Sequence, residues 1–153
     1  MRTGKRVLKV AREKYPTEDP YEICKREGIT LVRVEMEKNC LGFYLPVDTK
    51  CRVIMLQAGQ SPEEEREVVA NGLYYYFAGV KRKPGPIEKR RFLRFFPYLI
   101  GHWQANSFAA LLLCPSVSKC HSVREIMEEY DCDKRVAENR WKLEEEAMNY
   151  GGS

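Results

Sequence analysis

The sequence predicts an α+β domain in which N-terminal helices precede a small, mostly antiparallel three-stranded sheet and a bundle of helices follows it. Three observations lead to this prediction. The chain has 153 residues, 44% of them apolar, which is enough for one hydrophobic core. Apolar residues recur at helical spacing towards both ends, and three β-branched runs with short connections lie between them. We therefore expect a single domain over residues 1–153, with its core at about 7–143.

Two short helices are predicted at the start of the chain. The first covers Lys5 to Tyr15, where the apolar positions follow a helical period. The second begins after Asp19, a favourable N-cap, with Pro20 at the first helical position. Gly28 ends it, because glycine adopts the left-handed conformation of a helix C-terminus without strain.

Three strands are predicted after these helices. Ile29–Glu35 is rich in β-branched residues and roughly alternates, as a half-buried strand does. Leu41–Leu45 and Cys51–Leu56 have the same character. The residues between them, 46–50, contain Pro and Asp, which favour a turn. A hairpin is therefore the expected connection between the second and third strands.

A third helix has the strongest start signal in the chain. Ser61 is a good N-cap, Pro62 follows it, and Glu64 stands where a capping box requires an acidic residue. We expect this helix to run to about Phe77 and to be broken by Gly79. A loop over residues 81–86 should follow, because it contains two prolines and a glycine.

The C-terminal half is predicted to be helical throughout. Ile87–Leu113 should form a helix in two pieces, because Pro97 removes a helix hydrogen bond. A capping box that begins at Ser122 predicts a short helix to Tyr130. Asp133 is expected to cap a last helix that ends at Ala147, with residues 148–153 as a flexible tail.

The composition points to a cytoplasmic protein that makes no contact with a membrane. No apolar run approaches the roughly 18 residues of a membrane span, and no secretory signal is visible. No two of the six cysteines are close enough for a CxxC pair, so we expect reduced thiols. The net charge of +4 is mild and does not by itself call for a nucleic-acid partner.

Four segments taken in order resemble the ImmA/IrrE metallopeptidase family. The first is Asp19–Ile23 (DPYEI), placed before a Gly-Ile strand, and the second is Leu41–Tyr44 (LGFY). The third is the helix that Ser61 opens, with Arg66 inside it. The fourth is Ala105–Pro115 (ANSFAALLLCP), which is similar to that family's A-N-x-F-A-A-x-L-L-x-P helix. The resemblance covers most of the chain and implies a minimal zincin-like fold.

The resemblance also implies where a metal site would lie. In the family, the helix after the sheet carries HExxH, whose two His bind zinc and whose Glu is the general base. A third ligand, a Glu, stands about one turn before the Ala-Asn pair of the A-N-x-F-A-A helix. The five HExxH positions here are Asn71, Gly72, Leu73, Tyr74 and Tyr75. The third-ligand position falls on His102, or on Gln104 if the register shifts.

The residues at these positions predict a vestigial site. Asn71 and Tyr75 replace the two histidines, and an amide and a neutral phenol are poor zinc ligands. Gly72 has no side chain that takes a proton, and one imidazole at position 102 does not hold a catalytic zinc. We therefore expect no catalysis, no metal and no cofactor, although enzyme activity stays an open question. Tyr75 is expected to fill the vacated space, with its hydroxyl near Asn71 or His102.

Two other clusters offer alternative sites. A tetrahedral metal site is one alternative after folding, with Cys114, Cys120, His121 and Cys132 as its ligands. Buried or half-exposed thiols are the simpler interpretation of these cysteines. The second cluster is the basic residues from Lys81 to Arg94. They form either a patch that binds phosphates or an acidic partner, or simply a helix face exposed to solvent. The acidic last helix offers intramolecular neutralisation of this segment. The candidate binding residues in it are Arg82, Lys83, Arg90, Arg91 and Arg94.

Three functions remain open at this point. The first is a catalytically inactive domain of ImmA/IrrE type that binds a protein, such as the repressor of a phage or mobile element, and so affects transcription. The second is a nucleic-acid-binding regulatory module that uses the basic residues 81–94. The third is a residual metal-dependent peptidase with altered ligands. The sequence favours the first, because the residues that define the chemistry of the family are missing.

Overall fold

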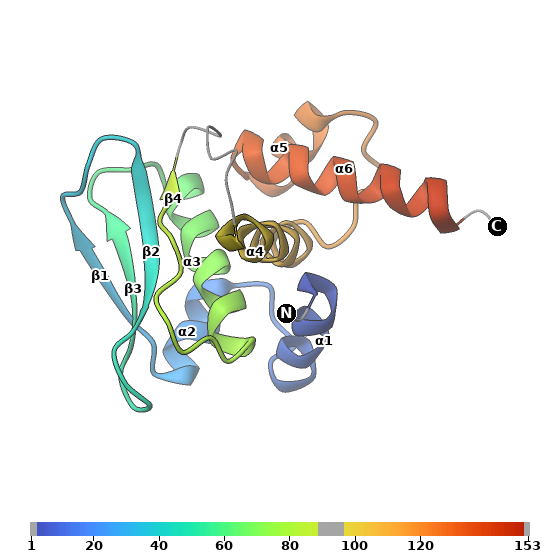
Figure 1. The fold of residues 1–153 in the computed structure, drawn as a ribbon. Helices are drawn as coiled ribbons and strands as arrows, with labels where there is room; N and C mark the ends of the chain where they lie inside the picture. The colour runs from blue at the N-terminus through green and yellow to red at the C-terminus, as the bar shows by residue number, and fades with distance from the viewer. Residues whose placement is uncertain (1–2, 89–96, 152–153) are drawn as a thin grey trace.

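The computed structural model describes residues 3–88 and 97–151, and it confirms the α+β class with N-terminal helices, a sheet and a C-terminal group of helices (Figure 1). Helix α3 separates the sheet from α4, and α4 in turn packs on α1 and α6. The elements in chain order are α1 (Gly4–Lys14), α2 (Pro20–Glu27), β1 (Thr30–Val34), β2 (Cys40–Pro46), β3 (Arg52–Gln57), α3 (Pro62–Phe77), β4 (Ile87–Glu88), α4 (Pro97–Leu113), α5 (Val123–Tyr130) and α6 (Lys134–Gly151).

The sheet is mixed and its described strands number four, in the order β1-β3-β2-β4. Strands β2 and β3 form the expected hairpin, with Tyr44 opposite Ile54. Strand β1 is parallel to β3, which lies between β1 and β2. The described sheet therefore has four strands where three were expected, and it is mostly antiparallel, as expected, with β1–β3 as its parallel pair. The connection 35–39 is long enough to carry the chain across two strand spacings of about 4.8 Å each, which leaves room for β3.

The second correction concerns the segment that was expected to begin a long helix at Ile87. Residues 87–88 form strand β4, which pairs antiparallel with β2, Ile87 opposite Gly42 and Glu88 opposite Cys40. The preceding prolines, Pro84 and Pro86, disfavour helical backbone at the residues before them. The free edge of β2 then provides the hydrogen-bonding partners that an extended segment needs. Helix α4 begins at Pro97. The part of the prediction over 89–96 falls outside the described residues.

Most helix ends lie where local signals placed them. The capping box of Ser61 and Glu64 is present at the start of α3. Asp19 caps α2, and Gly28 ends it with φ of 71°. Helix α6 continues to Gly151, so the end predicted at Ala147 was wrong and helix covers part of the expected tail. None of the helices in the described part of the chain is both long and apolar enough to span a membrane.

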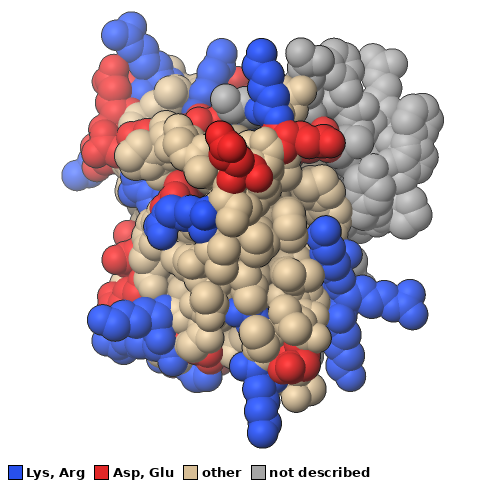
Figure 2. Space-filling model, turned by 90° about the vertical axis from the view of Figure 1, so that its left-hand side faces the viewer, with Lys and Arg blue, Asp and Glu red and all other residues tan. Residues whose placement is uncertain are grey.

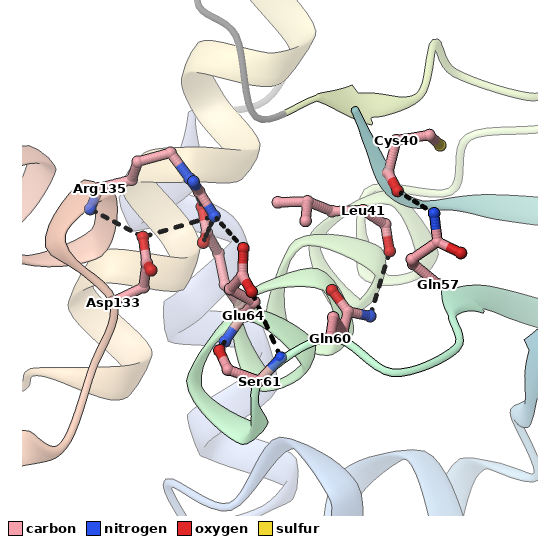
Figure 3. A network of polar contacts seen from close by, with 9 residues as sticks. Cys40, Leu41, Gln57, Gln60, Ser61, Glu64, Asp133 and Arg135 are labelled. Atoms are coloured by element: carbon pink, nitrogen blue, oxygen red, sulfur yellow. Dashed lines mark hydrogen bonds and ion pairs between the residues drawn. The ribbon is translucent and has the colours of Figure 1, made fainter. Parts of the chain in front are cut away.

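A buried ion pair joins α6 to α3 (Figure 3). Arg135 donates to both oxygens of the Glu67 carboxylate, at 3.3 and 2.9 Å, and Glu67 is almost completely buried. Glu64 and Asp133 lie 3.8 and 3.4 Å from the same guanidinium. Burial raises the pKa of Glu67, while the Arg135 guanidinium opposes that rise. The pair therefore fixes α6 against the first half of α3, the helix that carries the vestigial site.

Candidate functional site

The residues that the resemblance assigns to a lost metal site, still called the vestigial site below, lie on the second half of α3 and on the facing part of α4. Asn71, Gly72 and Tyr75 are all buried, and His102 is partly buried. Helix α3 is covered by the sheet on one side and by α4 on the other, so its middle turns are excluded from solvent (Figure 1). The structure thus brings Tyr75 and His102 together, 27 positions apart in the sequence.

Tyr75 and His102 share a hydrogen bond of 2.9 Å between the tyrosine hydroxyl and Nδ1 of the imidazole. This agrees with the expectation that the hydroxyl lies near Asn71 or His102. The Tyr75 ring stacks on Tyr44 of β2, with ring centroids 6.2 Å apart. Burial raises the pKa of Tyr75 far above its usual value and lowers the pKa of His102. Both groups are therefore neutral near pH 7, and Tyr75 fills the space between α3, β2 and α4.

Asn71 makes the second polar contact between the two helices. Its side-chain nitrogen donates to Oδ1 of Asn106 on α4, at 3.0 Å. Its own Oδ1 is buried and has no hydrogen-bond partner among the described residues. A buried polar atom without a partner costs about 1–3 kcal/mol, so Asn71 is tolerated here at some expense of stability. The sequence analysis named Asn106 only as part of a family-like helix and did not identify it as a partner of the site.

Gly72, which the resemblance aligns with the general base, faces the sheet at very short range. A Cβ atom at this position would lie 2.5 Å from Cδ1 of Ile54 and 2.7 Å from its Cγ1. Ile54 lies on β3 and is completely buried. A real Cβ does not approach another carbon so closely, because the van der Waals contact is about 3.5–4.0 Å. A glutamate at position 72 would therefore require Ile54 to move or to be replaced.

The described residues contain no group of three or more His, Cys, Asp or Glu side chains placed to hold a metal ion. The alternative site around Cys114 is realised only in part. Cys114 and Cys132 are buried, with their sulfurs 3.7 Å apart. His121 is exposed and Cys120 is half-buried. The simpler interpretation of these cysteines, as thiols packed in or near the core, agrees with this arrangement.

The basic segment is described only at its beginning. Arg82 and Lys83 are exposed, and Nζ of Lys83 lies 4.1 Å from the centroid of the Phe43 ring on β2. Arg90, Arg91 and Arg94 lie outside the described residues. On the acidic last helix, Glu144 pairs with Arg140 of the same helix at 3.0 Å, and Glu145 accepts a hydrogen bond from the Trp141 indole. These two acidic residues are thus engaged locally.

We also compared the sequence with models of known protein families and with curated proteins, and neither comparison finds a match.

Proposed function

We propose that this chain is a catalytically inactive domain of ImmA/IrrE type that acts by binding a protein. The hydrogen bond between Tyr75 and His102 carries the proposal. Two positions that the resemblance assigns to zinc ligands are there occupied by a neutral phenol and a neutral imidazole bound to each other. A catalytic zinc requires three protein ligands and an open position for water. A buried pair of this kind offers neither.

Two further contacts support the same proposal. The amide of Asn71, at the first histidine position, is bound to Asn106 on the facing helix. Gly72, at the position of the base, abuts Ile54 so closely that a longer side chain does not fit. The vacated metal position has thus been replaced by side-chain packing and hydrogen bonds that hold α3 to α4. We infer that the domain keeps the fold for binding, after the residues for hydrolysis were lost.

The proposed partner is a protein of the class that the resemblance suggests, a transcriptional repressor of a phage or mobile element. A test begins with the metal content of the purified protein. We expect substoichiometric zinc by elemental analysis and no cleavage of unstructured protein substrates. Stoichiometric zinc that is lost in His102→Ala, together with cleavage, would overturn the proposal and favour a residual peptidase.

A second experiment tests the register on which the proposal depends. We expect zinc binding when Asn71→His, Gly72→Glu, Tyr75→His and His102→Glu are combined with Ile54→Ala, which makes room for the glutamate. The matched control has the same substitutions but keeps Tyr75, so that one ligand is missing. A folded five-substitution variant that binds no more zinc than the control would show that these positions do not form the site.

The nucleic-acid-binding alternative keeps one observation in its favour. Lys81, Arg82 and Lys83 are exposed in the middle of the loop between α3 and β4. Binding to phosphates predicts an affinity for DNA that falls steeply with salt. Charge reversal of Arg90 and Arg91, with Lys5 and Lys9 of α1 reversed as a control, separates a specific basic patch from general attraction. Loss of salt-sensitive binding in the first variant only would favour this function over protein binding.

A further inference from the structure

The sheet has one face that no described helix covers. Helix α3 packs against β2 and β3 on one side, and Figure 1 shows the described helices all on that side. Ile54 and Leu56 of β3 point towards α3 and are completely buried. Because side chains alternate along a strand, Val53 and Met55 point to the opposite face. This opposite face is called the outer face below.

The outer face is apolar. Residues paired across neighbouring strands project from the same side of a sheet, so the register identifies its members. Phe43 and Val32 flank Met55, and Leu45 pairs with Val53. At its end Val34, opposite Gln57, is 38% exposed. The apolar side chains of the outer face are Val32, Val34, Phe43, Leu45, Val53 and Met55.

Figure 2 shows this face from the front: a largely uncharged centre with Lys and Arg side chains along its right-hand, lower and left-hand borders, and with Asp and Glu side chains along its upper and left-hand borders. The loop beyond the β2 edge provides exposed Lys81, Arg82 and Lys83, and the β2–β3 hairpin provides exposed Lys50. Lys83 lies against the ring of Phe43, which places it at the edge of the outer face. Asp48 in the same hairpin is already used, because its carboxylate accepts from the backbone N–H groups of Lys50 and Cys51.

We propose that the outer face is a docking surface for an amphipathic helix of another protein, with acidic residues along one flank of its apolar stripe. Apolar patches with a polar border mark protein or membrane interaction sites. The acidic flank would meet Lys50 and the basic residues 81–83, which favours one orientation of the helix and speeds association.

This inference rests on the proposed function only in that the domain acts by binding protein. It names a surface on the opposite side of the sheet from the vestigial site, because Gly72 and Tyr75 contact Ile54 and Tyr44 on the face that α3 covers. A partner on the outer face would therefore be bound whether or not the region between α3 and α4 can take a ligand.

The test uses a designed amphipathic helix of about 18 residues, roughly 27 Å long, with a leucine stripe flanked on one side by glutamates. A matched peptide carries lysines in place of the glutamates. We expect the acidic peptide to bind the full chain, measured by fluorescence anisotropy, and the basic peptide to bind at least about tenfold more weakly. Raising the salt concentration should reduce this difference, since screening weakens exposed charge pairs.

Two variants locate the binding surface. Val34→Glu and Met55→Glu each place a negative charge on the outer face and should weaken binding of the acidic peptide by at least about tenfold. The matched control is Val10→Glu on α1, where the valine is 43% exposed, and this change should leave the affinity unaltered. Val34 lies at the end of β1, so its variant keeps the test valid if Met55→Glu does not fold.

Four outcomes would overturn the inference: no binding of the acidic peptide, equal loss of binding in Val10→Glu, self-association abolished by Val34→Glu, or binding to anionic vesicles in place of the peptide. Self-association abolished by Val34→Glu would assign the outer face to a second copy of the chain. Binding to anionic vesicles would assign it to a membrane surface. Zinc-dependent cleavage would overturn the proposed function and leave the peptide result intact. The two failures are therefore distinguishable.

Discussion

Gly72→Ala offers a direct test of how tightly the vestigial site is closed. The added Cβ would lie 2.5 Å from Cδ1 and 2.7 Å from Cγ1 of the buried Ile54. Overpacking of a well-filled core costs about 1–3 kcal/mol. Replacing glycine by alanine within a helix returns about 1 kcal/mol through propensity. We therefore expect a net loss of about 0–2 kcal/mol in the free energy of unfolding.

Because the net effect is small, the sharper quantity is the coupling between the two positions. Ile54→Ala removes the three atoms nearest to the new Cβ, at a cost of about 2–5 kcal/mol by itself. In the double variant, the new methyl group at position 72 has room and fills part of the cavity. We expect the double variant to be more stable than the sum of the single changes by about 1–3 kcal/mol.

The assay is urea unfolding of the wild type, both single variants and the double variant, followed by circular dichroism. Equal slopes of the transitions would show that the comparison is valid. Additive changes, within about 0.5 kcal/mol, would refute the close contact between position 72 and Ile54. A Gly72→Ala variant whose free energy of unfolding rises by about 1 kcal/mol, the full difference in helix propensity, would also refute the close contact. Lack of space would then no longer exclude a glutamate at this position.

Three further predictions follow from the buried polar contacts. Tyr75→Phe removes the hydroxyl from Nδ1 of His102 and should cost about 1–3 kcal/mol, measured by urea unfolding. Burial lowers the pKa of His102 in the folded state, so the unfolded state binds more protons at acid pH. The contribution of neutral His102 to the free energy of unfolding should therefore be complete above pH 6.5 and fall as the pH drops towards the folded pKa. Urea unfolding as a function of pH should show a smaller loss of stability at acid pH in His102→Gln. Arg135→Met leaves Glu67 buried without its partner and should cost about 3–5 kcal/mol, whereas Arg124→Met, at an exposed pair, should change stability by less than about 1 kcal/mol.

The helix starts were predictable because their signals are local. The Ser61 box and the Asp19 cap each act within a few residues, and the structure contains both. Strand order was not predictable in the same way. Whether β1 meets β2 or β3 depends on contacts between distant segments, and alternation of apolar residues gives no information about the neighbour. Strand β4 was missed because it exists only where the free edge of β2 stabilises two residues in extended form.

The sequence analysis expected the Tyr75 hydroxyl near Asn71 or His102, and the structure places it against His102; the partners of Asn71 and Gly72 were not expected. A signal for Asn106 was present: residues 71 and 75 are four apart on α3, and 102 and 106 are four apart on α4, so two contacts between facing turns are geometrically natural. No comparable signal pointed to Ile54. Its approach to Gly72 depends on how closely β3 packs against α3.

The sequence by itself determined the class of fold and the starts of the helices that carry capping signals, because each of these is a property of residue types at short spacing. It also shows Asn71, Gly72 and Tyr75 where the resemblance would place the HExxH residues. The tertiary structure decided what surrounds Asn71, Gly72, Tyr75 and His102. Side chains from α3, α4 and β3 meet there, and only the packing of these elements shows that the space is filled. The tertiary structure also decided which face of the sheet no described helix covers. Alternation along a strand separates two sets of side chains, and only the position of α3 shows which set is buried.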